Sequence, residues 1–127
     1  MATTHFTDAE LNCPHCGDTR LSLEFLRELE RLRTMFGKPM LVTSGYRCPE
    51  YNDTVSSTGM GGPHTVGAVD VVIAGGRAFE LVGMAINLGW RGIGVKQHGP
   101  WNNRFIHLDR LNSLTEVRPR PRVWSYA

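Results

Sequence analysis

The stretch GPHTVGAVDVVI, at residues 62–73, decides the fold because it combines a strand signal with reactive side chains. Its second half is a run of Val and Ile, and such a run predicts a strand that is buried on both faces. Asp70 lies inside this run, and His64 precedes it by six residues. A buried carboxylate without a partner costs free energy, so a metal ion or an arginine must lie beside Asp70. The stretch therefore predicts a buried strand and one side of a polar site.

The stretch FIHLD, at residues 105–109, adds a second histidine and a second aspartate. His107 joins His64 and Asp70 in a candidate ligand set of nitrogen, oxygen and nitrogen. Catalytic zinc sites use three protein ligands and leave a fourth position for water. Side chains alternate along a strand, so Asp109 should share the face of His107, while the leucine between them points into the core. We therefore predict a Zn2+ site held by His64, Asp70 and His107, with Asp109 in the same cleft.

Capping residues and hydrophobic periodicity predict the helices. Thr7 and Glu10 form a capping box for a short helix. Ser22 is the expected N-cap of the longest helix, whose apolar residues recur at steps of three and four until Gly37 ends it. By the same periodicity, a second long helix is expected at residues 77–88.

The other expected elements are short, and they complete the class of fold. They are a buried strand at 40–43, strands at 68–73, 92–95 and 105–108, a helical turn from Pro49, a loop at 56–63, turns at 75–76 and 99–103, and an extended tail around Pro119 and Pro121. Helices followed by short strands with hairpin links predict the α+β class. The 127 residues fit one domain, residues 1–127, in which a mainly antiparallel sheet packs against helices.

Composition and charge exclude several classes of protein. The net charge is +2, and basic residues are dispersed until Arg118, Arg120 and Arg122, so the footprint of a nucleic-acid-binding protein is missing. No apolar run approaches the roughly 20 residues needed to span a bilayer. The first residues, MATTHF, lack the charged and apolar regions of a signal peptide. We therefore expect a monomer that is made in the cytoplasm, with no nucleic-acid partner and no membrane partner.

Three cysteines, Cys13, Cys16 and Cys48, argue against a pure disulfide framework because their number is odd. Cys13 and Cys16 form a single C-x-x-C, which is compatible with a zinc knuckle, with a reducible pair or with two ordinary thiols. Together with Cys48 and one histidine, they would supply the four ligands of a structural zinc site. A small zinc-ribbon-like interaction domain built on this pair is one hypothesis, although a single C-x-x-C supports it poorly.

Four motifs carry a resemblance to a known family: SGYR at 44–47 with Asn52, HTVGAVD at 64–70, GIGV at 92–95 and FIHLD at 105–109. In this order they resemble the M15 zinc peptidases, and most closely the D-alanyl-D-alanine carboxypeptidase-like subgroup that includes many phage endolysins. The resemblance covers nearly the whole chain and implies the small α+β fold of the hedgehog and DD-peptidase group. It also implies one zinc ion, bound by the counterparts of His64, Asp70 and His107.

The same resemblance assigns roles in hydrolysis. Arg47 is expected to bind a substrate carboxylate or to polarise the scissile carbonyl. Several relatives place an acid three residues before the second histidine, where this chain has Arg104, so Asp109 is the nearest candidate for the general base. An alternative role for Asp109 is to orient His107. Three further residues are expected at the substrate cleft: Tyr46, His98 and Trp101.

The stretch around His64 departs from the family pattern in two ways. Gly62 stands where the family has a serine, and the spacing from His64 to Asp70 is one residue shorter. A shift of one residue turns a strand side chain to the opposite face. A bulge or a loop adjustment before Ala68 must therefore compensate if Asp70 is a metal ligand.

The resemblance predicts a zinc metallopeptidase that hydrolyses stem peptides of bacterial peptidoglycan, in the manner of a phage endolysin. The bond is D-Ala-D-Ala in a carboxypeptidase, or an L-Ala-D-Glu or cross-link bond in an endopeptidase. Without a signal peptide, such an enzyme would reach the wall through a holin-type lesion or by delivery within a virion. The alternative from another class is a non-catalytic, zinc-containing wall-binding module with the same fold.

Overall fold

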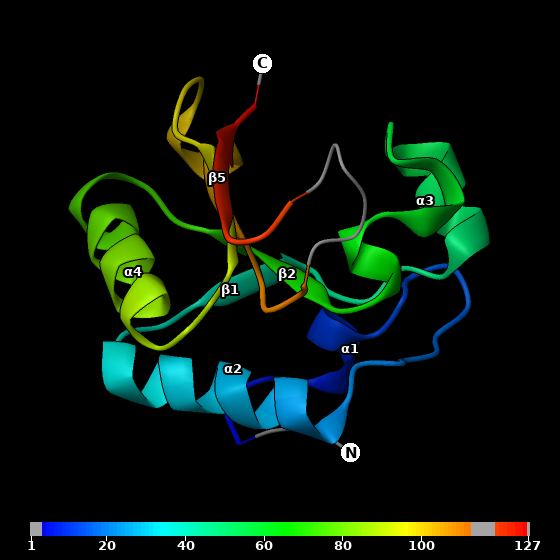
Figure 1. Cartoon of the computed structure of the whole chain (residues 1–127), viewed down its shortest axis with the longest axis horizontal. Coiled ribbons are helices and arrows are strands. Elements are labelled where there is room, and N and C mark those ends of the chain that lie inside the picture. Colours follow the sequence, from blue (N-terminus) through cyan, green and yellow to red (C-terminus); the bar gives the residue numbers. More distant parts are fainter. Residues whose placement is uncertain (1–3, 113–118, 127) are drawn as a thin grey trace.

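A five-stranded sheet forms the centre of the computed structural model, which describes residues 4–112 and 119–126. Its strands are β1 (Leu41–Ser44), β2 (Ala68–Val72), β3 (Gly92–Lys96), β4 (Phe105–Asp109) and β5 (Arg122–Ser125). They lie in the order β1-β2-β4-β3-β5, and every neighbouring pair is antiparallel except β3 and β5. The expected small α+β fold with a mainly antiparallel sheet is therefore confirmed (Figure 1).

Helices and short 3-10 turns surround this sheet. They are α1 (Asp8–Leu11), α2 (Leu23–Phe36), α3 (Pro49–Val55), α4 (Gly75–Asn87) and the turns η1 (Gly59–Gly61), η2 (Pro63–Thr65) and η3 (Trp101–Asn103). The capping box of Thr7 and Glu10 and the Ser22 cap are both present, and Gly37 ends α2 with a left-handed φ of 72°. Within the described ranges, no helix combines the length and apolar character that crossing a membrane requires.

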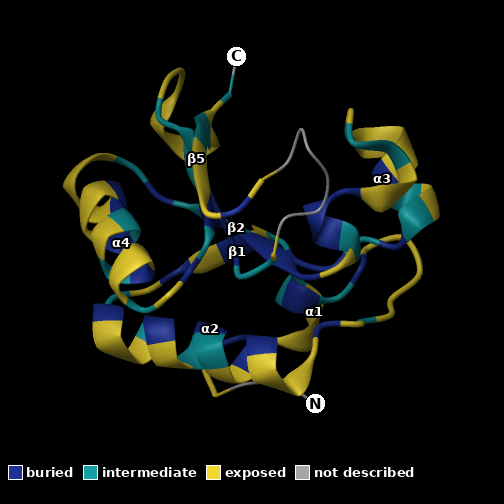
Figure 2. Cartoon of the chain, in the orientation of Figure 1, coloured by how far each residue is buried: buried dark blue, intermediate teal, exposed yellow. Residues whose placement is uncertain are grey.

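The core lies between one face of the sheet and the two long helices. In Figure 1, α2 runs along the bottom of the molecule, α4 stands at its left and α3 at its right. Alternate residues of β2 and β4 join the helices in one buried cluster: Val69, Val71, Ile106 and Leu108 with Leu29, Leu32 and Leu81. Asp70 and His107 belong to the opposite face, because side chains alternate along a strand. The sheet therefore has an apolar face that packs on the core and a second face that carries polar side chains. Figure 2 shows that its central strands are largely buried.

Two elements differ from the sequence-based expectation. The strand expected to be buried at 40–43 is β1, an edge strand in which Leu41 is 58% exposed, because only one face of it packs on the core. The helix expected at 77–88 begins earlier, at Gly75, where a turn was expected. Gly75 nevertheless keeps a left-handed φ of 65°, so the chain does turn at this residue before the helix runs on.

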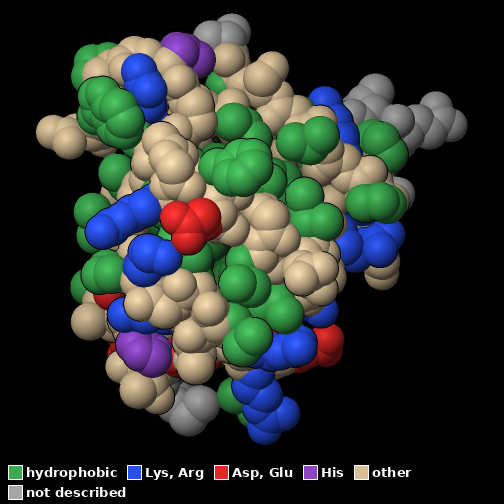
Figure 3. All heavy atoms as spheres, turned by 90° about the vertical axis from the view of Figure 1, so that its left-hand side faces the viewer, with side chains coloured by type: hydrophobic (Ala, Val, Ile, Leu, Met, Phe, Trp, Pro, Cys, Tyr) green, Lys and Arg blue, Asp and Glu red, His purple; other side chains and the backbone are tan. Residues whose placement is uncertain are grey.

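The apolar side chains of α4 lie in two rows that have different environments. Ala78, Leu81 and Ala85 face the core, whereas Phe79 is 84% exposed and Ile86 is 59% exposed. Figure 3 views the side of the molecule that carries α4, and hydrophobic side chains there lie beside basic ones. The amphipathic pattern therefore placed the helix correctly, but it did not identify which apolar row is buried.

The C-terminal tail is extended, as expected, but it does more than cross the surface. It forms β5, which pairs in parallel with β3 so that Trp124 lies opposite Gly94. A Cβ on Gly94 would lie 2.8 Å from Trp124 and from the Tyr126 hydroxyl, so only glycine lets the tail pack this closely. The GIGV motif thus has a steric function, which is to make room for aromatic residues of the tail.

Candidate metal centre

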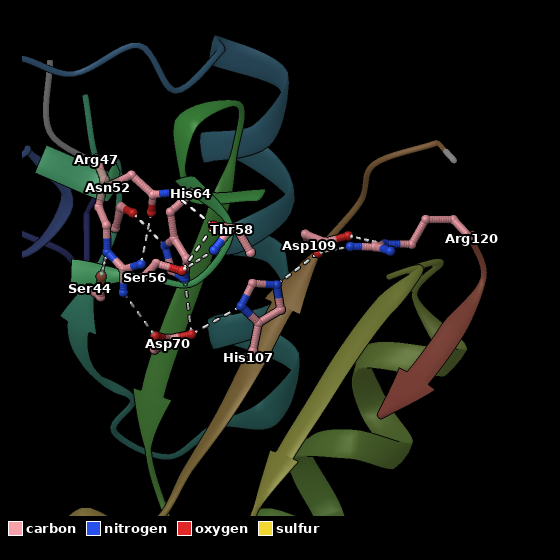
Figure 4. A network of polar contacts seen from close by, with 11 residues as sticks. Ser44, Arg47, Asn52, Ser56, Thr58, His64, Asp70, His107, Asp109 and Arg120 are labelled. Atoms are coloured by element: carbon pink, nitrogen blue, oxygen red, sulfur yellow. Dashed lines mark hydrogen bonds and ion pairs between the residues drawn. The ribbon is translucent and has the colours of Figure 1, made fainter. Parts of the chain in front are cut away.

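Three side chains from three elements converge on the polar face of the sheet (Figure 4). His64 comes from η2, Asp70 from β2, and His107 from the opposite position on β4. The Asp70 Oδ1 atom lies 3.2 Å from His64 Nε2 and 3.1 Å from His107 Nδ1. One ligand atom from each residue lies within 4.8 Å of the others. The η2 turn before Ala68 thus provides the loop adjustment that the short spacing requires.

Hydrogen bonds on the far side of each imidazole fix the position of its proton. His64 Nδ1 donates to the backbone carbonyl of Gly45 at 2.7 Å, and His107 Nε2 donates to Asp109 Oδ2 at 2.8 Å. Carbonyl and carboxylate oxygens only accept, so in each neutral ring the other nitrogen carries a lone pair. Both of these lone pairs point toward the same oxygen of Asp70. Such an arrangement repels unless a cation or a proton lies between, and two imidazoles with one carboxylate are a donor set that suits zinc.

The same contacts set the pKa values of the metal-free groups. Burial alone would raise the pKa of Asp70, but the contacts with His107 and His64, in which a proton then lies between nitrogen and oxygen, hold it well below its usual range. Burial alone would lower the pKa of His107, but hydrogen bonds to Asp109 and Asp70 raise it. Both carboxylates therefore stay ionised, and the Asp70 carboxylate is available to bind a cation.

Asp109 is fully buried behind His107, on the side of the imidazole away from Asp70. Arg120 grips it with two hydrogen bonds, from Nε to Oδ1 and from Nη2 to Oδ2, each of 2.9 Å. Burial alone would raise the pKa of Asp109, but hydrogen bonds from His107 and Arg120 lower it to about 2. A Cβ on Gly92 would collide with this carboxylate, so the glycine is required here. Of the two roles expected for Asp109, these contacts favour the orientation of His107.

A pocket of about 410 Å³ opens onto the three converging side chains. Its wall includes Arg47, Phe105, Arg122, Trp124 and Tyr126. Burial raises the pKa of Tyr126 to about 12, so its hydroxyl stays protonated and remains a donor. Asp70 is the single acid among the described residues that line this pocket. The pocket therefore offers several cationic and donor groups around one anionic centre.

Arg47 is held in a fixed orientation at the edge of this pocket. Its Nε donates to Ser44 Oγ at 3.1 Å and its Nη1 donates to Asn52 Oδ1 at 3.1 Å. Its Nη2 lies 3.7 Å from Asp70 Oδ2. Asn52 is fully buried and is itself bound to Thr58 and to the Gly59 carbonyl. The SGYR motif and Asn52 therefore act together to aim one end of the guanidinium at the polar centre.

Gly62, which stands in place of the family's serine, also has a steric reason. A Cβ at this position would collide with the side chain of Thr58, and Thr58 supports Asn52. The departure from the family pattern is thus tied to the support of Arg47.

The three residues expected at the substrate cleft do not line this pocket. Tyr46 is buried, and its backbone N–H donates to the Leu11 carbonyl. Trp101 is 62% exposed, and His98 contacts the backbone carbonyl of Tyr126 through Nε2 at 3.2 Å. None of the three lines the pocket.

Two aromatic residues of the C-terminal tail, Trp124 of β5 and Tyr126 just after it, line the pocket. The centroid of the Trp124 ring lies 5.1 Å from that of the His107 ring, and the centroid of the Tyr126 ring lies 5.0 Å from that of Phe105. In RVWSY, which follows two prolines, Arg122, Trp124 and Tyr126 stand at alternate positions, and this strand-like pattern is the signal that points to the wall.

The family model described as Peptidase M15 matches residues 4–109 of the chain. This span runs from α1 to the end of β4, and it includes all three converging side chains. Strand β5, which supplies Trp124, lies outside it. No curated protein and no solved structure matches the chain.

Proposed function

Since this chain belongs to the peptidase M15 family, we propose that it is a zinc-dependent peptidase that hydrolyses stem peptides of bacterial peptidoglycan. The observation that carries the proposal is the convergence of His64, Asp70 and His107 at the base of a pocket. Three protein ligands with one open side are the arrangement of a catalytic zinc site. Within the family, the motifs favour the D-alanyl-D-alanine carboxypeptidase-like subgroup, which includes many phage endolysins.

The three ligand residues would hold the zinc ion through His64 Nε2, an Asp70 oxygen and His107 Nδ1. When bound, zinc supplies Lewis-acid activation of water and of the scissile carbonyl. Asp109 keeps His107 in the required tautomer, because it accepts the Nε2 proton at 2.8 Å and leaves Nδ1 free to bind metal. Arg120 holds Asp109 in place with two hydrogen bonds.

The charges of the pocket support an anionic peptide substrate. Arg47, Arg120 and Arg122 line it, and Asp70 would be neutralised by the metal. Stem peptides of peptidoglycan carry free carboxylates, with which arginine side chains form charge-assisted hydrogen bonds. With Nε and Nη1 already used by Ser44 and Asn52, the remaining nitrogen of Arg47 is the one to bind a substrate carboxylate or the scissile carbonyl oxygen. Tyr126, which directly follows β5, adds a protonated hydroxyl to the wall of the pocket.

Digestion of defined muropeptides tests this proposal. The zinc-loaded protein should release fragments that mass spectrometry identifies, a chelator should abolish their release, and added zinc should restore it. Release of the terminal D-alanine would identify a carboxypeptidase, and cleavage at L-Ala-D-Glu or at a cross-link would identify an endopeptidase. If the zinc-loaded protein binds peptidoglycan but cleaves none of these substrates, the chain is instead a wall-binding module.

A further inference from the structure

A second cluster of ligand-type side chains lies apart from the pocket. The sulfur atoms of Cys13, Cys16 and Cys48 lie within 4.8 Å of one another, although no two of them form a disulfide. His15 Nδ1 lies 3.4 Å from the sulfur of Cys48. None of these four residues lines the pocket at Asp70. Two segments that are about 30 residues apart in sequence therefore bring three thiols and one imidazole together.

The first segment forms a tight turn that aims its two thiols in one direction. The Gly17 N–H donates to the Cys13 carbonyl at 2.8 Å, and Gly17 has a left-handed φ of 73°. The Cys13 N–H donates to the Asp18 carbonyl at 2.8 Å, which closes the loop on the other side. A C-x-x-C held in a turn is the usual half of a structural zinc site.

The second segment supplies Cys48, which directly precedes α3. Its backbone N–H donates to the Cys13 sulfur at 3.4 Å. A hydrogen bond of this kind stabilises a thiolate more than a thiol, because the thiolate is the stronger acceptor. The His15 ring also stacks on the Tyr51 ring of α3, with 5.9 Å between centroids and 6° between planes. These contacts hold the imidazole beside the sulfur of Cys48, on the same loop that carries the other two thiols.

The spacing of the sulfurs suits a metal better than it suits a disulfide. Tetrahedral zinc with bonds of about 2.3 Å places its sulfur ligands roughly 3.8 Å apart, so a contraction of about 1 Å from the observed limit suffices. A disulfide joins two sulfurs at about 2.05 Å and would leave the third thiol without a partner. Burial of cysteine as a small apolar residue explains Cys13 and Cys48, but it does not explain why the exposed Cys16 joins them.

We propose that Cys13, Cys16 and Cys48, with His15 as the fourth ligand, form a structural zinc site that is separate from the pocket. Four protein ligands leave no position for water, so this site supports the fold and does not hydrolyse peptides. It joins the loop after α1 to the start of α3. Arg47 directly precedes Cys48, and Asn52 of α3 holds Arg47, so the site also anchors one wall of the pocket.

Metal analysis of the whole chain tests this site without any reference to peptidase activity. The wild-type protein should carry two zinc ions, and a His64→Ala, His107→Ala variant should keep one. When cobalt replaces zinc in that variant, it should show thiolate-to-cobalt charge-transfer absorption, and adding Cys16→Ser should remove most of this absorption. Cys16 is exposed, so the serine leaves the core unchanged. His5→Ala, at an exposed histidine paired with Glu30, is the matched control for the loss of a histidine.

Thiol alkylation of the wild-type protein gives a second measurement that needs no variant to fold. All three thiols should be protected while zinc is bound and should react after a chelator is added. One zinc ion in the wild type, with thiols that react equally with and without chelator, would overturn the proposal. A mass showing the loss of two hydrogens in the protein as purified under reducing conditions would assign a disulfide instead. Either result leaves the proposed peptidase activity untouched.

Discussion

The two clusters of ligand-type residues differ in how the fold supports them. His64, Asp70 and His107 lie on or beside paired strands, and they face a pocket of about 410 Å³. The cysteines lie on a turn and at the start of a short helix, with His15 stacked on Tyr51 beside Cys48. Strand pairing fixes side chains precisely while it leaves one side open to a substrate, whereas a turn wraps around an ion and leaves no room. The difference suggests that one cluster is catalytic and the other is structural.

The largest expected effect follows from removing a ligand at the sheet. His107→Ala should reduce muropeptide hydrolysis to the level seen without protein, because the metal centre loses one of its three ligands. Zinc content should fall by one ion, and the ion at the cysteines should remain. Metal analysis and fragment release check both statements, with His5→Ala as the control. Loss of both ions would contradict the distinction between a catalytic and a structural site, since it would show that the two clusters depend on each other.

The residues near this cluster show what the sequence was able to predict. The Val-rich strand with Asp70 and the FIHLD stretch have local signals, and pairing of β2 with β4 places Asp70 opposite His107. The longest helix is also confirmed, because its caps and its apolar spacing agree. Local patterns predict an element when one face is apolar and its ends carry capping residues.

The missed features depend on contacts between distant segments. The pairing of β5 with β3 is parallel and joins residues about 30 positions apart, so no hairpin turn in the sequence predicts it. The ion pair of Arg120 with Asp109 also follows from that pairing, because it brings the tail beside β3. For this reason the sequence analysis expected His98 and Trp101 at the substrate cleft, whereas Trp124 and Tyr126 line the pocket at Asp70. Of the glycines of β3, Gly94 makes room for the tail and Gly92 makes room for the Asp109 carboxylate, and neither requirement can be read from the neighbouring residues.

A second prediction separates the two roles of Asp109. Asp109→Asn removes the charge that faces His107 and Arg120, so zinc affinity at the sheet should fall by roughly 10- to 100-fold. Hydrolysis should recover most of its rate once zinc is present in excess. Zinc titration followed by single-turnover hydrolysis measures both quantities. A variant that binds zinc normally and yet turns over at least about a hundredfold more slowly would instead identify Asp109 as the general base.

A third prediction concerns the residue that joins the two clusters. Arg47→Lys keeps the charge but cannot contact Ser44, Asn52 and a substrate oxygen at the same time. Losing one hydrogen bond to a charged group costs about 1.5 kcal/mol, which is about tenfold in kcat/KM. Both zinc ions should remain. Arg77→Lys, at an exposed position of α4, is the matched control. Unchanged hydrolysis by the Arg47 variant would assign this arginine to the structural pair with Asp70 alone.

The smallest expected effect on the reaction, and the sharpest test of the comparison, comes from Cys16→Ser. Serine is not a zinc ligand in place of a thiolate, so the ion at the cysteines should be lost while the strands that carry His64 and His107 stay paired. At 25 °C with excess zinc, the hydrolysis rate should change by less than about twofold. The free energy of unfolding should fall, because an ion at 100 times its Kd stabilises a fold by about 2.7 kcal/mol. A loss of that size lowers the Tm of a domain of this length by roughly 10 °C. If hydrolysis falls as far as in His107→Ala, the cysteines support catalysis directly; if Tm does not change with zinc, they are ordinary thiols.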